Sequence, residues 1–145
     1  MAVTVKSITL WRKEVADQPG ELGATLRPLA DAKAELQVVM GYRYPGAPGK
    51  AAIELAPVSG KKAQAAAESA GLRASNFPAL QVIGDDRPGL GRAFADAIAG
   101  AGINIDFLVA QVVGRKYSAI FGFANTADAQ AAAGLIKKVA NNKKK

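Results

Sequence analysis

Residues 86–105 read DRPGLGRAFADAIAGAGINI, and residues 17–36 read DQPGELGATLRPLADAKAEL. The two segments align without a gap at a spacing of 69 residues (86 − 17). Both begin with Asp-x-Pro-Gly, and alanines recur at matching positions from Ala24 and Ala93 onward. Self-similarity at a fixed period is typical of a duplicated structural unit. The sequence therefore predicts two related units of roughly 70 residues each.

The second unit has the clearer pattern of apolar residues. A helix is predicted after the Asp-x-Pro-Gly turn because apolar residues recur at helical spacing, and strands are predicted where they cluster or alternate. After the last helix only Asn-Asn-Lys-Lys-Lys remains, so this unit is predicted to lack its last strand. The predicted elements are a strand at Phe77–Ile83, a helix with Leu90, Phe94, Ala97, Ile98 and Ala101 on one face, alternating strands at Ile103–Val109 and Tyr117–Phe123, and a helix from Thr126, its expected cap, to Val139.

The first unit follows the same order with weaker signals. Pro28 lies inside its first helical stripe, where it removes a hydrogen bond and is expected to kink or shorten the helix. An alanine-rich helix is expected to begin at a Ser59 cap and to end at Gly71. The predicted elements are a strand at Val3–Val15, a helix with Leu22, Leu26 and Leu29, strands at Leu36–Tyr42, with Leu36, Val38, Met40 and Tyr42 facing a core, and at Ala51–Val58, the alanine-rich helix and a short strand at Leu72–Ser75.

These patterns predict an α+β fold made of two ferredoxin-like βαββαβ units. Each unit is expected to form an antiparallel sheet with both helices on one face. Two units side by side would share one sheet and cover each other's exposed edges. The predicted boundaries are 1–75 for the first unit, 76–140 for the second and 141–145 for a basic tail.

Composition excludes several classes of function. The chain has 145 residues, of which 50% are hydrophobic and 21% are charged, a balance typical of a globular protein. It has no cysteine and no histidine, which excludes disulfides, Cys/His zinc sites, cysteine nucleophiles and Ser-His-Asp triads. We expect no cofactor and no metal site. The amino-terminal residues lack the apolar run of a signal peptide, and no stretch is long enough to span a membrane, so we expect a cytoplasmic protein.

The net charge of +7 is concentrated at the carboxyl terminus. Five lysines lie within the last nine residues, and without them the rest of the chain has a net charge of only +2. A short lysine-rich end is usually a solvated terminus, with a binding arm as the alternative. The body of the protein is therefore near neutral.

The chemistry is expected at the two Asp-x-Pro-Gly turns. Proline suits the first position of a helix, and glycine allows close approach to the backbone. The free amides of the first helical turn, such as those of Glu21, Leu22, Leu90 and Gly91, would attract a carboxylate, helped by the helix dipole. The preceding aspartate would accept a hydrogen bond from an ammonium group, so one turn would hold both ends of an amino acid. The structural alternative is that each aspartate merely caps its helix.

The motif Asp86-Arg87-Pro88-Gly89-Leu90, followed by a helix that ends at Ala101-Gly102-Ile103-Asn104-Ile105, resembles the ACT domain, a small regulatory module that binds amino acids. The first unit keeps the Asp-x-Pro-Gly turn but has Lys33-Ala34-Glu35-Leu36 in place of Gly-Ile-Asn-Ile. The resemblance covers two tandem copies from about Ile8 to Val139. It implies ligand binding between paired domains, where the turn of one domain meets the second strand of its neighbour. The residues that it implicates are Asp17, Gln18, Gly20, Leu22, Asp86, Arg87, Gly89, Leu90 and Asn104.

Other classes fit the sequence less well. Leu90-Gly91 stands where a phosphate-binding loop requires lysine and serine or threonine. An RNA-recognition module shares the element order, but Ala119 and Gly122 occupy the positions of its stacking aromatics. Carboxylates such as Asp85 have no partner that marks a general acid/base pair, so we expect no enzyme and no catalytic residue.

The sequence thus favours a tandem ACT-like regulatory protein without a catalytic domain. The expected ligand is a small amino acid or a related metabolite. The expected partners are further copies of the chain and a regulated enzyme, with no membrane and no nucleic acid. The alternative is a scaffold of the same fold that binds a partner protein but no ligand.

Overall fold

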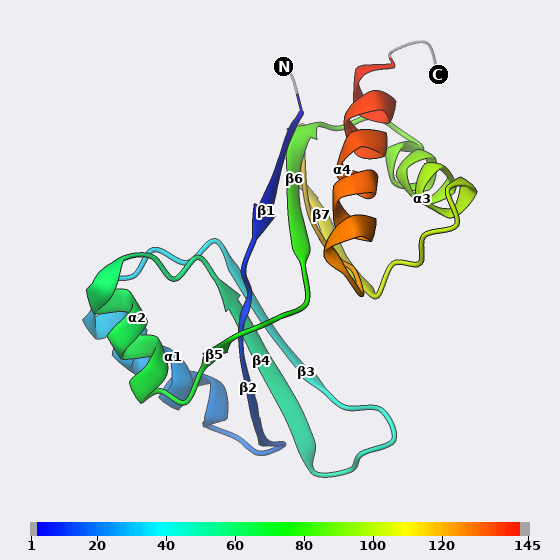
Figure 1. Ribbon diagram of the computed structural model, residues 1–145. Helices are drawn as coiled ribbons and strands as arrows, with labels where there is room; N and C mark the ends of the chain where they lie inside the picture. The colour runs from blue at the N-terminus through cyan, green and yellow to red at the C-terminus, as the bar shows by residue number, and fades with distance from the viewer. Residues whose placement is uncertain (1–2, 143–145) are drawn as a thin grey trace. The chain divides into compact units, whose positions relative to one another are not determined.

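The computed structural model describes residues 3–142 and shows two α+β units, the first in the order βαββαβ and the second in the order βαββα with an added strand from the amino-terminal segment (Figure 1). The first unit spans Thr9–Asn76, and the second unit combines the segment through Ile8 with the segment from Phe77 onward. The first unit contains β2 (Trp11–Ala16), α1 (Glu21–Asp31), β3 (Val38–Arg43), β4 (Lys50–Ala56), α2 (Gly60–Ser69) and β5 (Arg73–Ala74). The second contains β1 (Thr4–Ile8), β6 (Ala79–Asp85), α3 (Leu90–Gly100), β7 (Phe107–Val113), β8 (Lys116–Gly122) and α4 (Thr126–Asn141).

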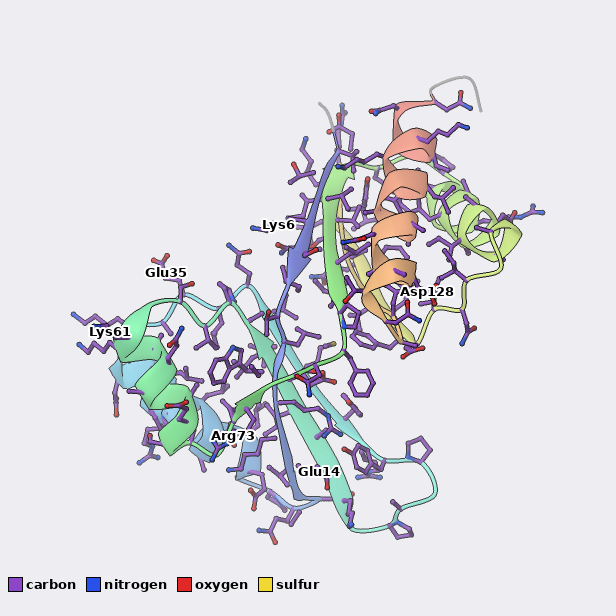
Figure 2. All side chains as sticks on the ribbon, in the orientation of Figure 1. Lys6, Glu14, Glu35, Lys61, Arg73 and Asp128 are labelled. Carbon is purple, nitrogen blue, oxygen red and sulfur yellow. The ribbon has the colours of Figure 1, made fainter. Side chains whose placement is uncertain are left out.

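The first unit is an antiparallel sheet of order β3-β4-β2-β5, covered on one face by α1 and α2. Its core joins Leu29 of α1 and Ala67 of α2 to Ile53 and Leu55 of β4. Ile53 and Leu55 are two positions apart, so both point to the helix side of the strand. The predicted one-sided α+β architecture is confirmed. Figure 2 shows the charged Lys61 and Glu35 projecting outward at the helix side of this unit.

The second unit is an antiparallel sheet of order β1-β6-β8-β7, with α3 and α4 on one face. The predicted core residues of β8 are buried beneath the helices. The ring of Phe94 on α3 lies 5.7 Å from that of Tyr117 and 6.2 Å from that of Phe121, and Ile98 on the same helix face is fully buried. These aromatic side chains therefore form the core and do not offer an exposed platform for stacking RNA bases.

The predicted single strand at Val3–Val15 is wrong, because the chain forms two strands there that belong to different sheets. β1 pairs with β6 of the second unit, whereas β2 pairs with β4 and β5 of the first. Leu10, between β1 and β2, is 1% exposed. β1 covers the edge of β6 and supplies the strand that the second unit's own segment lacks. A free edge would otherwise leave unpaired backbone groups. The predicted boundaries of 1–75 and 76–140 therefore assign β1 to the wrong unit.

The alternating residues Val38, Met40 and Tyr42 of β3 do not face the helices, contrary to the prediction, whereas Leu36, which precedes β3, packs against the helix-side core as predicted. In the second unit Ile103 and Ile105 pack against the core, but Phe107 and Val109 of β7 lie on the other face. Directly paired residues of antiparallel strands share a face of the sheet. Met40 pairs with Glu54 and Phe107 pairs with Gly122, in rows on the side away from the helices. Apolar residues occupy both faces of β3, Val39 as well as Met40, so alternation alone did not identify the core side.

Helix ends differ in detail from the predictions. Asn125, and not Thr126, caps α4, since its side-chain oxygen accepts a hydrogen bond from the Asp128 amide at 2.8 Å. α1 contains Pro28 yet continues to Asp31. Residues 143–145 of the predicted basic tail lie outside the described residues. Over residues 3–142, no helix has both the length and the apolarity that crossing a membrane would require.

Candidate functional site

Both Asp-x-Pro-Gly turns place glycine, and not aspartate or proline, immediately before the helix. Gly20 has φ +94° and Gly89 has φ +83°, a left-handed conformation that glycine adopts without steric cost. Pro19 and Pro88 therefore precede the cap, and the predicted proline at the first helical position is wrong. Neither helix has a side-chain cap, so the alternative that the aspartates serve as caps is also wrong.

The backbone at each turn is open to approach. A Cβ atom built on Gly20 or Gly89 would meet nothing within 4 Å. The Leu90 amide is engaged, because it donates to the Arg87 carbonyl at 3.3 Å. The next amides, of Gly91 and Arg92, belong to the first turn, whose N–H groups have no acceptor within the helix. These amides carry the positive end of the α3 dipole and remain suited to an anion.

Polar side chains at the turn of the first unit pair with one another. The Asp17 carboxylate forms an ion pair with Nε of Arg43 on β3 at 2.8 Å. Nε2 of Gln18 donates to the Glu21 carboxylate at 2.7 Å. Two of the predicted ligand residues are therefore engaged within the protein. Leu22, which was predicted to bind ligand at this turn together with Asp17, Gln18 and Gly20, is 43% exposed.

The turn of the second unit engages a different side chain. The half-buried Arg87 reaches the end of α4, where Nη2 donates to the Val139 carbonyl at 3.0 Å and Nη1 donates to the Ala140 carbonyl at 3.3 Å. A cation at this end of a helix stabilises the last carbonyls and the dipole. Asp86 uses its amide to bond the Arg115 carbonyl, but within residues 3–142 no ion pair engages its carboxylate. The structure thus gives Arg87 a structural contact and leaves the Asp86 carboxylate available.

Asn104 lies far from the turn of its own unit. It follows α3, whose 11 residues span about 16 Å from the turn. The pairing register agrees, because Asp85 shares a row with Lys116 and Val113, whereas Phe107, just after Asn104, lies at the opposite end of the sheet. The structure therefore does not bring Asn104 together with Asp86 in one unit.

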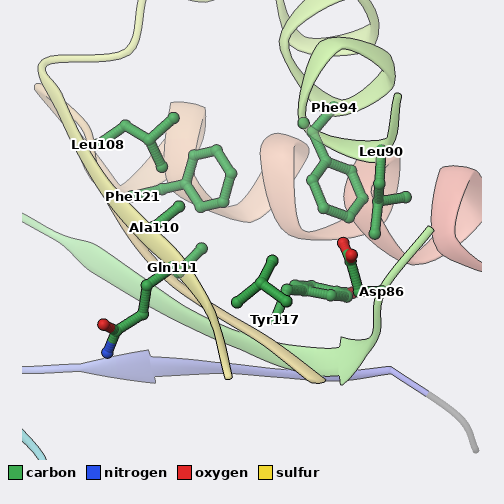
Figure 3. Close-up of a pocket in the computed structure, with 11 residues that line it drawn as sticks. Asp86, Leu90, Phe94, Leu108, Ala110, Gln111, Tyr117 and Phe121 are labelled. Atoms are coloured by element: carbon green, nitrogen blue, oxygen red, sulfur yellow. The ribbon is translucent and has the colours of Figure 1, made fainter. Parts of the chain in front are cut away.

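A pocket of about 180 Å³ lies next to the second turn, on the helix side of the sheet (Figure 3). Asp86 is the one charged residue among the described residues that line it, and Figure 3 shows its carboxylate near Leu90, Phe94 and Tyr117. Of the pocket residues, the sequence analysis had implicated only Asp86 and Leu90 as ligand residues. The lining residues are Asp86, Leu90, Gly91, Phe94, Leu108, Ala110, Gln111, Val112, Tyr117, Ala119 and Phe121.

Tyr117 lies deep in this region and is 6% exposed. Its side chain passes over Gly84, where an added Cβ would lie 2.9 Å from the hydroxyl oxygen. Within the described residues the buried hydroxyl has no hydrogen-bond partner. Burial raises the pKa of Tyr117 above its ordinary value, because the phenolate would lose its hydration.

At the edge of the same turn, Asp85 pairs with Lys116 of β8 across the sheet. The hydrogen bond from the ammonium group of Lys116 lowers the pKa of Asp85 to about 2. The two adjacent aspartates therefore differ in role. Asp85 is held by a cation, and Asp86 faces the pocket.

Solved structures share the fold over nearly the whole chain. A protein from Bacteroides thetaiotaomicron has a TM-score of 0.72 and 11% identity, with 90% of this chain and 88% of that chain covered. The ligand-free regulatory subunit of aspartate kinase from Thermus thermophilus has a TM-score of 0.64 and 18% identity, with 96% and 97% covered. The corresponding subunit from Thermus flavus has a TM-score of 0.60 and 17% identity, also with 96% and 97% covered.

No protein-family model matches the sequence, and neither does any curated protein sequence. At the identities of the solved structures, the likeness establishes the fold. The predicted α+β architecture of two tandem ferredoxin-like units is therefore confirmed. The aspartate kinase subunits are regulatory and not catalytic parts of an enzyme.

Proposed function

We propose that this protein is a regulatory module without catalytic activity of its own, which binds a small amino acid or a related metabolite at an Asp-x-Pro-Gly turn. The observation that carries the proposal is the open Gly89 turn beside the Asp86 carboxylate, which no ion pair engages within residues 3–142. The amides of Gly91 and Arg92 are suited to a carboxylate, and Asp86 is suited to an ammonium group. One turn thus offers both charges that a zwitterion needs.

Asn104 would contact a ligand only at the turn of a neighbouring unit. Since α3 separates Asn104 from its own turn by about 16 Å, Asn104 would reach a ligand only at the turn of another unit. We therefore propose that ligand binding stabilises the pairing of units, which fits a homo-oligomer. The likeness to regulatory subunits of aspartate kinase supports a regulated enzyme as the partner class.

A thermal-shift screen of the twenty amino acids tests the proposal. A ligand present at 100 times its Kd stabilises the folded state by about 2.7 kcal/mol. For a chain of this size, that raises Tm by roughly 5–10 °C. We expect one amino acid, or a few of similar chemistry, to raise Tm, and Asp86→Asn to abolish the shift. Asp17→Asn is the matched control, because it alters the equivalent aspartate of the first turn, which already pairs with Arg43. Absence of any shift at millimolar concentrations contradicts the proposal.

A ligand-free scaffold is the second candidate, and the edge strand β7 favours it. Among residues 3–142, β7 pairs only with β8, and it exposes Val109 by 47% and Val113 by 69%. An apolar edge strand is suited to pairing with another chain. Light scattering after size-exclusion chromatography, on the wild type and on Val113→Lys, measures this association. A scaffold predicts an assembly that Val113→Lys disrupts and that no amino acid alters.

A further inference from the structure

The two turns are equivalent in position but differ in the residue that the edge strand places beside each aspartate. In the first unit Val15, Ala51 and Arg43 form one row across the sheet. In the second unit the corresponding row is Gly84, Tyr117 and Val112. Both Val15 to Gly84 and Arg43 to Val112 differ by the same 69 positions as the two turns.

This difference between Arg43 and Val112 determines whether a cation lies beside the aspartate of each turn. In the first unit Arg43 reaches back to Asp17 and neutralises it at 2.8 Å. In the second unit Val112 has no charge to offer, and it lines the same pocket as Asp86. The first turn therefore holds an internal cation, whereas the second turn has a carboxylate and an apolar space where that cation would lie.

The apolar space results from the residues on both of its walls. On β7, Leu108, Ala110 and Val112 pair with the helix-facing residues of β8, yet Leu108 is 45% exposed and Val112 is 53% exposed. The helices thus leave this edge of the sheet partly uncovered. Gly91 and Ala110 are too small to fill the gap. The first unit differs on the helix wall as well, with Glu21, Leu22 and Thr25 in place of Leu90, Gly91 and Phe94.

We propose that the second turn alone is the ligand site of each chain, and that the ligand is an amino acid with a bulky apolar side chain. This inference rests on the proposed function. Asp86 accepts a hydrogen bond from the ammonium group of the ligand. This ammonium group replaces the cation that Arg43 supplies to Asp17 in the first unit. The amides of Gly91 and Arg92 take the carboxylate, and the side chain enters the pocket between α3 and β7.

Size and polarity select the side chain. An engineered apolar cavity of about 150 Å³ binds benzene. The pocket of about 180 Å³ therefore admits a side chain of the size of leucine, methionine or phenylalanine. A serine or alanine side chain would leave most of the apolar wall of the pocket in contact with water. The binding free energy that comes from burying this apolar surface would then be lost. A charged side chain would lose its hydration against Leu90, Phe94 and Phe121, and Asp86, the one charged residue among the described residues of the lining, is already engaged by the ammonium group of the ligand.

Isothermal titration of the full chain with leucine, methionine, phenylalanine, serine, threonine, aspartate and lysine tests the inference. We expect one of the three apolar amino acids to bind at least tenfold more tightly than the four polar ones. Val112→Arg should weaken this binding at least tenfold, because it copies the Arg43 pair and places a cation beside Asp86. Val113→Arg is the matched control on the opposite face of β7, and it should change Kd less than twofold. Arg43→Val, in the other unit, should also change Kd less than twofold.

Ala110→Leu provides a second test that adds volume without charge, and it keeps the inference testable if Val112→Arg does not fold. Loss of apolar binding in Ala110→Leu supports the pocket assignment. Tightest binding of a polar amino acid, or apolar binding that both pocket variants retain, overturns the inference while the proposed function stands. Binding of no amino acid overturns both.

Discussion

Among the predicted ligand residues, Arg87 makes a structural contact that a single substitution tests directly. Its guanidinium donates two hydrogen bonds to the last carbonyls of α4, at 3.0 Å and 3.3 Å. Arg87→Met removes both donors and keeps most of the aliphatic stem. Hydrogen bonds from a charged donor contribute about 1.5–3 kcal/mol. The longer bond is weak, and Arg87 is only half buried, so we expect a total loss of about 1.5 kcal/mol.

The expected loss corresponds to a decrease in Tm of roughly 3–6 °C for a chain of this size. Differential scanning calorimetry or thermal circular dichroism measures this change. Arg92→Met is the matched control, because Arg92 is 86% exposed and pairs only with Asp96 on the same helix. Such a surface pair contributes about 0.3–0.5 kcal/mol. Equal Tm values for the two variants would refute the contact between Arg87 and α4.

Three further predictions concern the second unit. Gly122→Ala should destabilise the protein, because the new Cβ would clash with the Phe107 ring; denaturant unfolding measures the loss, and Phe107→Ala in the same chain should recover part of it. Tyr117 has a folded-state pKa above its unfolded value, so its contribution to stability is full below about pH 10 and is lost as the pH rises through the folded pKa. Burial also raises the pKa of Tyr42, so ultraviolet titration should show phenols that ionise later than an ordinary tyrosine, and Tyr117→Phe should remove one of them. Asp85 should titrate near pH 2 in carbon-detected NMR, and Lys116→Met should return its pKa toward 3.8; an Asp85 pKa that this variant leaves unchanged would contradict the pairing.

The sequence predicted the features that local pattern determines. The helical face of α3 and the buried alternation of β8 were correct, because each depends on residues a few positions apart. The split between β1 and β2 was missed, since both segments are strand-like and only Thr9 and Leu10 separate them. Which sheet each strand joins depends on partners far away in the chain, such as β6 for β1.

The candidate site was predicted in part for the same reason. The turns and their glycines were identified from local sequence, but the partner of Arg87 lies 52 residues further on. The contrast between Arg43 and Val112 was visible in principle, because extending the repeat by a few positions aligns them. The alignment did not give the pairing register of the strands, which places Arg43 and Val112 each beside the aspartate of its own turn. The pocket itself depends on how far α3 covers β7, which no local pattern specifies.

Mapping amide chemical shifts by NMR as leucine, methionine or phenylalanine is added tests most directly where the ligand binds. We predict that the amides of residues 89–92 and those of the pocket strand β7 shift with a common Kd, while the amides of residues 20–23 do not. Shifts confined to residues 20–23, or no shift at either turn with any of the three amino acids, would contradict the account.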